Sequence, residues 1–528
     1  IPRKRQRLLI GVPPKPLQES FPEFASMTIS QLGLKAFKLE DTWEEMVQDL
    51  RALRASFESL VSVLSCKKTL QDNSDFLLDS AKALLKSRAM AMDEVELRTA
   101  RKCFSILWPP IAETRMSRLE YCAACTPLAV PQKNEDGTTA QLPLQVERAD
   151  LFNSAVSQIQ KATIDELRKP LQVTFVGEAA EDAGGPRREF FNDFGRSCSE
   201  RQDLWQTTPI GSLTPQTIST STSSNIFQSC GRVYGLALCQ AENAAQEQRV
   251  GENATIQELL AAVTGDEEPQ AQQQKLLVGA ALARPFLRCV QADAPESVED
   301  LQAELNAEQA ENSPDFRGST AFLTSSLGEL GLEGQLTFSR QKPDGTVVQL
   351  KPRGSEETVT DATKLEWLRA VLRSELVESI EEAARFFRLG VCEAAGAAYL
   401  VLLSTVELQQ EWSGMPEITD ADLKFWQERS TINPARKQQS AWFFETLWSQ
   451  EWRDCRPKVL KFTTGSDRWP RDPKGFTFHV EPMDGGDEVL PRAMTCGNML
   501  QLPSYSSKEQ LQLQLLKACD LGLSMQLV

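Results

Sequence analysis

The length of the chain limits its architecture more than any other feature, because 528 residues cannot pack around a single hydrophobic core. At roughly 150 residues per domain, the chain has room for about three units. Hydrophobic residues make up 41% of the chain and charged residues 25%, the balance of an ordinary globular protein, so a sizeable core is available. We therefore expect a multidomain protein.

The N-terminal part of the chain carries helical patterns. A capping box at Thr42–Glu45 predicts a helix start, and apolar residues recur at helical spacing over Trp43–Leu64. Further helical stretches lie around Leu77–Leu85 and Val95–Trp108, and the polar stretch Gln132–Thr139 then predicts a boundary. These patterns predict an α-helical N-terminal region over residues 1–141.

Strand patterns appear later in the chain. Apolar and polar residues alternate over Leu336–Leu350 on both sides of the turn Lys342–Gly345, which predicts a β-hairpin. Three polar stretches predict loops, at Gln206–Ser224, Gly265–Lys275 and Asn312–Thr320. The mixture of helical and strand patterns predicts an α+β fold.

Charge and hydropathy exclude two classes of partner. The formal net charge is −16, from 57 basic and 73 acidic residues, so the overall field repels phosphate and we expect no nucleic-acid partner. The longest apolar stretch, Leu389–Leu403, is interrupted by Glu393 and is too short to cross a bilayer, so we expect no membrane span.

The start of the chain and its cysteines bear on its compartment. The first residue is Ile1 and no signal segment follows, so we expect the chain to begin inside a longer protein. We expect it to be cytoplasmic, with the nucleus as an alternative. Twelve scattered cysteines predict reduced thiols rather than disulfides. Cys122 and Cys125 have the spacing of metal ligands, but no second pair or nearby histidine completes a zinc site, so we expect packed helix cysteines and no metal or cofactor.

The single histidine of the chain, His479, limits the available chemistry. Phe476, Phe478 and Val480 alternate with polar residues around it, which predicts a half-buried strand with His479 facing solvent. A serine or cysteine triad would need that exposed imidazole to reach a distant nucleophile. We therefore expect any chemistry here to proceed without histidine.

Several segments carry motifs in a recognisable order. Val173 and Phe175 suit a strand, and Asp182–Phe191 adds a glycine pair followed by a helix start. Glycines punctuate the helical stretch Phe227–Ala237, and a turn follows at Leu350–Gly354. In order and spacing these segments resemble the HECT ubiquitin-ligase domain, over about residues 142–528. Further matching segments are Leu144–Arg148, Glu407–Gly414 and Trp442–Phe444.

The last seventy residues carry the motif on which the functional prediction depends. Lys461–Arg468, Leu490–Leu500 and Leu502–Ser507 resemble the start and the catalytic cysteine motif of that family's smaller lobe, which reads "LP, HTCFN, L, LP, Y, S". Cys496 falls on the position of the nucleophile.

The residues around Cys496 support this assignment independently. The cysteine follows the turn Asp484–Asp487 and stands between Thr495 and Gly497-Asn498, so we expect an accessible sulfur on a polar loop. Cys519 instead shares a face with two leucines of the next helix and is predicted to be core. We expect Ser506 and Glu509 to cap that helix.

The resemblance implies an architecture and a reaction. The architecture is a bilobal HECT domain, with a larger, mostly helical N-lobe over 142–428, a smaller α/β C-lobe over 434–528 and a hinge at Gln427–Asn433, preceded by the helical region 1–141. The implied reaction accepts ubiquitin from a conjugating enzyme as a thioester on Cys496 and transfers it to lysine of protein substrates. The implied partners are the conjugating enzyme, ubiquitin and those substrates.

Exchange between thioesters requires mainly a thiolate, and a free thiol is only a few per cent ionised at neutral pH. Thr495, through its hydroxyl, and Asn498, through its amide groups, are the candidate donors beside Cys496, together with the Gly497 amide.

Some residues depart from the family pattern. Met494 replaces the usual histidine and Gly497 the usual phenylalanine, and the tail Asp520–Val528 lacks the family's phenylalanine, for which Leu523 or Met525 could substitute. The stretch around Gln240–Thr320, where family members bind the conjugating enzyme, resembles them least. Three hypotheses therefore remain: an active thioester ligase, a catalytically silent relative that binds conjugating enzyme or ubiquitin, and a cysteine hydrolase that uses His479.

Overall fold

The structure is a computed structural model, and its described residues divide into two compact units. The smaller unit contains the described residues up to 125 together with 291–293 and 395–404, and the larger contains the rest. The described residues are 94, 95, 97, 98, 100, 101, 122, 125, 140–178, 185–217, 221–249, 276–308, 322, 324–341, 345, 347–471, 473 and 475–524.

The smaller unit contains helical residues from the N-terminal region. The described positions between Glu94 and Arg101 are helical, and Leu97 is completely buried. Arg101 donates to the carbonyls of Leu400 and Leu403 at the end of α17 (Ala398–Leu402). Cys122 and Cys125 are buried and helical, as expected. The predicted helices over Trp43–Leu64 and Leu77–Leu85 lie outside the described residues.

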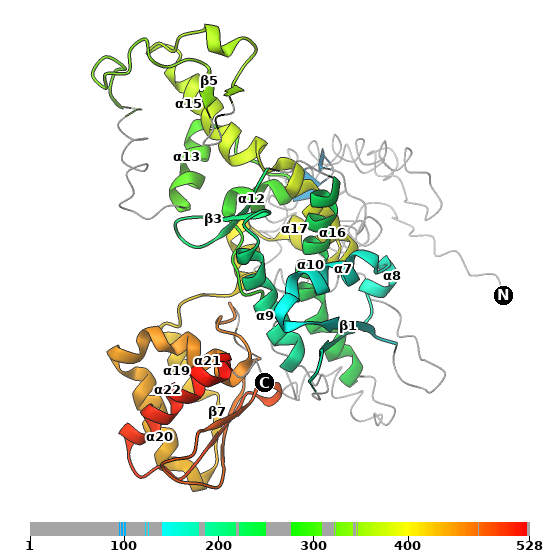
Figure 1. Cartoon of the computed structure of the whole chain (residues 1–528), viewed down its shortest axis with the longest axis vertical. Helices are drawn as coiled ribbons and strands as arrows, with labels where there is room; N and C mark the ends of the chain where they lie inside the picture. The colour runs from blue at the N-terminus through cyan, green and yellow to red at the C-terminus, as the bar shows by residue number, and fades with distance from the viewer. Residues whose placement is uncertain are drawn as a thin grey trace, which may run out of the picture. The chain divides into compact units, whose positions relative to one another are not determined.

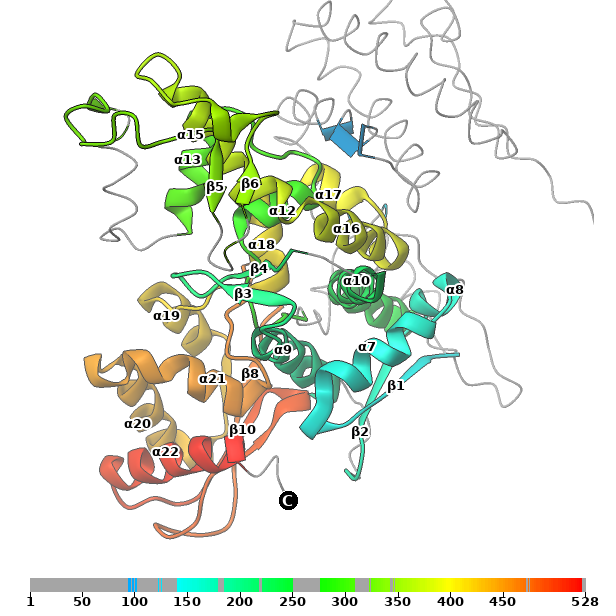
Figure 2. The same cartoon turned by 45° about the horizontal axis from the view of Figure 1, so that its top comes forward.

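The larger unit begins with a parallel pair of strands. β1 (Leu142–Val146) pairs in parallel with β2 (Leu171–Phe175), which confirms the predicted strand around Val173. Helix α7 (Leu151–Lys161) contacts β1, α9 (Gly185–Glu200) and α10 (Ser221–Arg249), an arrangement that Figure 2 shows. The connection between the strands holds η2 (Arg148–Asp150) and α8 (Ile164–Leu167).

The glycines of the predicted central helix have a packing reason. A Cβ added at Gly231 of α10 would lie 2.0 Å from the Phe387 carbonyl oxygen of α16 (Glu381–Ala395). In return, a Cβ at Gly390 of α16 would lie 1.9 Å from the Gln228 carbonyl oxygen of α10. The two helices therefore cross so closely that only glycine fits at both positions.

The predicted hairpin is present, whereas one predicted loop contains regular structure. β5 (Ser339–Gln341) pairs antiparallel with β6 (Val347–Gln349). The stretch 206–224 holds parts of the antiparallel strands β3 (Trp205–Thr207) and β4 (Leu213–Pro215) and the start of α10. The many serines and threonines of this stretch predicted a loop, but the stretch contains part of a strand pair that begins at the buried Trp205. The other helices here are α12 (Arg284–Val290), α13 (Val298–Ala307), η3 (Gly354–Glu356), α15 (Lys364–Arg373), η4 (Ser374–Glu378) and α18 (Thr405–Ser413).

The C-terminal part of the larger unit is built on a four-stranded sheet in the order β7-β8-β10-β9. Residues between Ile418 and Cys519 form one buried hydrophobic cluster around Trp426. Figure 1 shows the elements of this cluster, coloured orange to red, gathered in one group. The helices and strands of this part of the chain are α19 (Asp420–Glu428), β7 (Ser430–Ile432), η5 (Pro434–Arg436), α20 (Lys437–Trp448), η6 (Gln450–Cys455), α21 (Arg456–Thr464), β8 (Phe478–Pro482), β9 (Arg492–Met494), η7 (Thr495–Gly497), β10 (Met499–Leu502) and α22 (Lys508–Ser524).

The segment Gln427–Asn433, predicted as a hinge, is part of this packed group instead. β7 pairs in parallel with β8, from Ser430 opposite Phe478 to Ile432 opposite Val480. Leu423 and Trp426, on the helix just before it, are completely buried in the same core. The hinge prediction is therefore wrong, because both sides of the segment pack in one core.

Among the described residues, no helix is both long and apolar enough to cross a membrane.

Candidate active site

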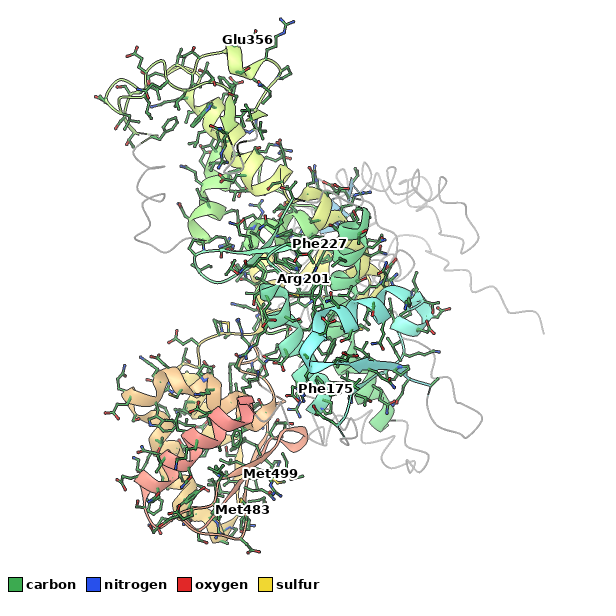
Figure 3. The ribbon with its side chains drawn as sticks, viewed as in Figure 1. Phe175, Arg201, Phe227, Glu356, Met483 and Met499 are labelled. Carbon is green, nitrogen blue, oxygen red and sulfur yellow. The ribbon has the colours of Figure 1, made fainter. Side chains whose placement is uncertain are left out.

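The backbone of Cys496 lies in a tight turn between two neighbouring strands. η7, Thr495–Gly497, connects β9 to β10, and the two strands pair antiparallel with Met494 opposite Met499. Met499, labelled in Figure 3, is the first residue of β10. The turn that contains Cys496 therefore lies at one end of the β9–β10 strand pair. The sulfur of Cys496 lies outside the side chains that the structure describes.

Asn498 fixes the end of this turn. Its backbone is left-handed (φ 46°), a conformation that asparagine tolerates better than most residues. Its side-chain nitrogen donates to the Thr477 carbonyl at 2.8 Å, and its backbone carbonyl accepts from the His479 amide at 3.0 Å. The residue is 4% exposed. Asn498 therefore anchors the turn on β8, and its role as a donor to the thiol stays a prediction.

The segment before the cysteine is held by the residues after β10. Asp487 accepts from the Ser506 amide at 2.7 Å and from the Ser506 hydroxyl at 2.6 Å, and these hydrogen bonds lower the pKa of its carboxyl. The hydroxyl of Tyr505 donates to the Val489 carbonyl at 2.7 Å, and burial raises the pKa of this phenol. The "LP, Y, S" motif thus fixes the loop that leads into β9.

Helix α22 begins one residue later than the predicted cap implies. The hydroxyl of Ser507 accepts from the Gln510 amide at 3.3 Å, so Ser507 is the capping residue. Ser506 is engaged by Asp487 and cannot fill that role. The prediction of Ser506 as the cap is therefore wrong.

Helix α9 contacts the cysteine turn from the other side. The guanidinium of Arg188, in the first turn of α9, donates to the Thr495 carbonyl and to the side-chain oxygen of Asn498. These two acceptors stand on either side of Cys496 in the sequence. Gly465, which ends α21 with φ 86°, lies beneath them: a Cβ there would be 3.8 Å from the Cβ atoms of Arg188 and Thr495.

Two further ion pairs join α9 to the same neighbourhood. Asp193 pairs with Lys461 of α21 at 2.9 Å, and both side chains are largely buried. Arg196 pairs with Asp467, just after α21. Figure 2 shows α9 facing α21. Charged residues of α9 therefore contact the segment Lys461–Arg468, which the sequence analysis also identified.

Three charged residues, Arg148, Glu178 and Glu189, form a cluster next to Arg188. Arg148, which follows β1, pairs with Glu189 at 3.0 Å and also with Glu178 beyond β2. The Arg148 guanidinium lies 3.8 Å from the centroid of the Phe175 ring, which Figure 3 labels. This cluster secures the beginning of α9 against both strands. It therefore fixes the backbone from which Arg188 extends.

The described cysteine side chains leave few candidates for a nucleophile. All of them are buried except that of Cys455, which is half-buried. Burial raises the pKa of Cys519 to about 12, and that of Cys392 to about 12 as well. A thiol with so high a pKa is almost entirely protonated at neutral pH and is a poor nucleophile. The prediction of Cys519 as core is confirmed.

His479 occupies the predicted strand and stands beside the cysteine turn. Phe478 and Val480 on either side of it are completely buried, so the predicted alternation is confirmed. His479 is half-buried rather than exposed, because it lies between β7 and β10, opposite Thr431 and Met499.

Within the described part of the chain, no group of three or more metal-ligating side chains gathers into a metal site.

The structure brings Thr495 and Asn498 to the same turn as Cys496 but links both to Arg188. Sequence reasoning read Arg188 only as part of a scaffold motif. No local signal pointed to its contacts, because Thr495 and Asn498 lie more than 300 positions further along the chain.

Comparison with known proteins identifies the domain that carries this turn. Residues 269–528, which include Thr495, Cys496 and Asn498, match the family model "HECT-domain (ubiquitin-transferase)". Similar proteins include the probable E3 ubiquitin-protein ligase HERC4 of Homo sapiens, 25% identical over 389 residues, and the E3 ubiquitin-protein ligase HACE1 of Danio rerio, 27% identical over 395 residues. The E3 ubiquitin-protein ligase HUWE1 of Mus musculus is 25% identical over 396 residues.

These alignments cover 72%, 72% and 71% of this chain but 32%, 38% and 8% of the respective relatives. The chain therefore spans less than two fifths of the length of each of these relatives. The matched region contains the strand-turn-strand around Cys496, and the order of the sequence motifs is also that of a HECT domain. Residues 269–528 of the chain therefore carry a HECT domain, and the chain is similar to E3 ubiquitin-protein ligases.

Proposed function

We propose that the chain is a ubiquitin ligase that accepts ubiquitin as a thioester on Cys496 and transfers it to lysine of a protein substrate. The observation that carries the proposal is the position of Cys496, in the η7 turn between β9 and β10 inside the matched HECT domain. The burial of the other cysteine side chains described, apart from Cys455, supports the same choice. The partners are a ubiquitin-conjugating enzyme, ubiquitin and protein substrates.

Two acyl transfers make up the proposed reaction. The Cys496 thiolate attacks the carbonyl carbon of the ubiquitin thioester on the conjugating enzyme, a new thioester forms, and the conjugating enzyme's cysteine leaves as a thiolate. A neutral substrate amine then attacks the Cys496 thioester. An amide bond forms, the Cys496 thiolate leaves, and the amine proton passes to a base. Neither step changes an oxidation state, so no cofactor is required.

We place the boundary between the two proposed lobes at 414–419 rather than at 428–434. This stretch separates α18 from α19, and Thr419 caps α19. The core that begins at Ile418 supports this placement. Gly414 has φ 60°, and Met415 exchanges two backbone hydrogen bonds with Trp469, at 2.7 Å and 3.0 Å. A bend here would move the Cys496 sheet as one body.

The test is a charging assay with the purified chain, ubiquitin-loaded conjugating enzymes and no substrate. We expect a ubiquitin adduct that disappears on treatment with a thiol reductant and that forms isopeptide products when lysine is added. If a panel of conjugating enzymes gives no adduct while ubiquitin or conjugating enzyme still binds, the proposal fails and the catalytically silent alternative replaces it.

His479 separates ligase chemistry from a cysteine hydrolase. We expect His479→Ala to keep the rate of adduct formation within about threefold of wild type, because thioester exchange needs no imidazole and the His479 amide that binds Asn498 is retained. A hydrolase that used His479 as its base would lose on the order of a hundredfold or more. The measurement is the single-turnover rate of charging, alongside hydrolysis of a ubiquitin thioester. Loss of both activities in His479→Ala would contradict the ligase mechanism proposed here.

A further inference from the structure

Arg188 makes an unusual pair of contacts for an arginine in a scaffold helix. Its two terminal nitrogens reach two acceptors of one turn, the Thr495 carbonyl and the Asn498 side-chain oxygen. The residue is 7% exposed, so the guanidinium is largely removed from water. Its partners are separated from it by about three hundred residues of chain. The contact therefore joins two distant motifs at the residues that flank Cys496.

The fork of a guanidinium fixes geometry as well as charge. Two nitrogens held by two acceptors restrain the distance and the direction between those acceptors, which a single ammonium cannot do. Here the acceptors stand at the beginning and just beyond the end of η7. Asn498 is also tied to Thr477, so its side chain has little freedom to follow a different conformation. The turn is thus clamped between α9 and β8.

We propose, on the basis of the function proposed above, that Arg188 is a positioning residue that holds the Cys496 turn in its reactive conformation and favours the thiolate. An arginine stays protonated at any relevant pH, so its positive charge at the turn stabilises an anion there. The Arg148–Glu189 pair fixes the helix start that carries Arg188. The contact makes the reactivity of Cys496 depend on the docking of α9 against the turn.

The structure offers a matched control on the same helix. Arg196, two turns after Arg188 in α9, pairs with Asp467 rather than with a residue of η7. Arg196→Gln therefore removes one charge and one contact between α9 and the end of α21 and leaves the Thr495 and Asn498 hydrogen bonds in place. Arg188→Gln removes those hydrogen bonds. Arg188→Lys keeps the charge but cannot reproduce the fork.

The experiment measures the alkylation rate of Cys496 by iodoacetamide from pH 6 to pH 10, by mass spectrometry of the peptide that contains it. For Arg188→Gln we expect the rate at pH 7 to fall about threefold to tenfold, with the midpoint of the pH profile shifted upward, because a unit charge has left the turn. Arg188→Lys should recover part of the loss. Arg196→Gln should match wild type.

A purely structural role for Arg188 would give a different result. If Arg188→Gln keeps the wild-type pH profile, or if Arg196→Gln shifts it equally, the proposal is overturned. The buried Cys198 and Cys519 report on folding in the same digests, since they become alkylated only when the protein opens. A variant in which they react is replaced by Arg188→Lys for the comparison. No ubiquitin is used, so this result and that of the charging assay can fail independently.

Discussion

Replacement of Cys496 by serine is expected to convert the reducible ubiquitin adduct into one that survives thiol treatment, and replacement by alanine to abolish it. Serine oxygen can attack the same thioester, but the product is an oxygen ester, which thiol reductants do not cleave at a comparable rate. The hydroxyl is far less ionised than a thiol, so formation should slow by on the order of a hundredfold or more. Gel analysis with and without reductant distinguishes the three proteins.

The matched control is Cys455→Ser. Cys455 is half-buried at the end of η6 and packs against the hydrophobic cluster that contains Leu500 and Leu502 of β10, the strand that follows the Cys496 turn. Because it lies outside the turn, its loss should leave the rate and the reducibility of the adduct unchanged. An adduct that persists in Cys496→Ala, or one that disappears in Cys455→Ser, would assign the thioester to another cysteine and end the proposal for Cys496.

Much of the secondary structure near the site could be predicted because its signals are local. Alternation over Phe476–Val480 gives a strand whose inner residues must be apolar, and β8 has this pattern. The spacing of Leu511, Leu515 and Cys519 places them on one helix face, and all three are buried in α22. A run of neighbouring residues contains the whole signal in each case. The motif around Cys496 is local in the same sense.

The contacts that shape the site could not be predicted, because they join residues far apart in the chain. Arg188 and Asn498 are 310 positions apart, and no periodicity relates them. β7 is only three residues long, so it carries no alternation that distinguishes it from a linker, and it pairs with β8 across a stretch that contains the α-helices α20 and α21. The predicted hinge failed for this reason, and the contacts of Asn498 with Arg188 and Thr477 were not foreseen for the same reason.

The corrected position of β7 leads to a large expected difference between two fragments. A fragment of residues 416–528 should unfold cooperatively in urea, whereas one of residues 434–528 should lack a cooperative transition. The shorter fragment loses Ile418, Leu423 and Trp426, which are at most 1% exposed in the shared core. Truncation of such residues costs about 2–5 kcal/mol each, so the loss of all three approaches the whole stability of a small domain, roughly 5–15 kcal/mol. Removal of β7 also leaves the edge of β8 unpaired.

Two tryptophan substitutions in the longer fragment test whether lost core packing, rather than the shorter length of the chain, destabilises the shorter fragment. The Trp426 ring lies 5.4 Å from that of Phe478 and 6.0 Å from that of Trp469, and we expect Trp426→Ala to lower the free energy of unfolding by about 3–5 kcal/mol. Trp448, 39% exposed at the end of α20, is the matched control, and Trp448→Ala should cost under about 1 kcal/mol. Two results would contradict this expectation: equal losses of unfolding free energy in the two variants, or equally cooperative unfolding of residues 434–528 and 416–528. Residues 418–432 would then contribute nothing to the stability of this core. The hinge predicted at Gln427–Asn433 would then stand, because rotation there would disrupt no stabilising contact.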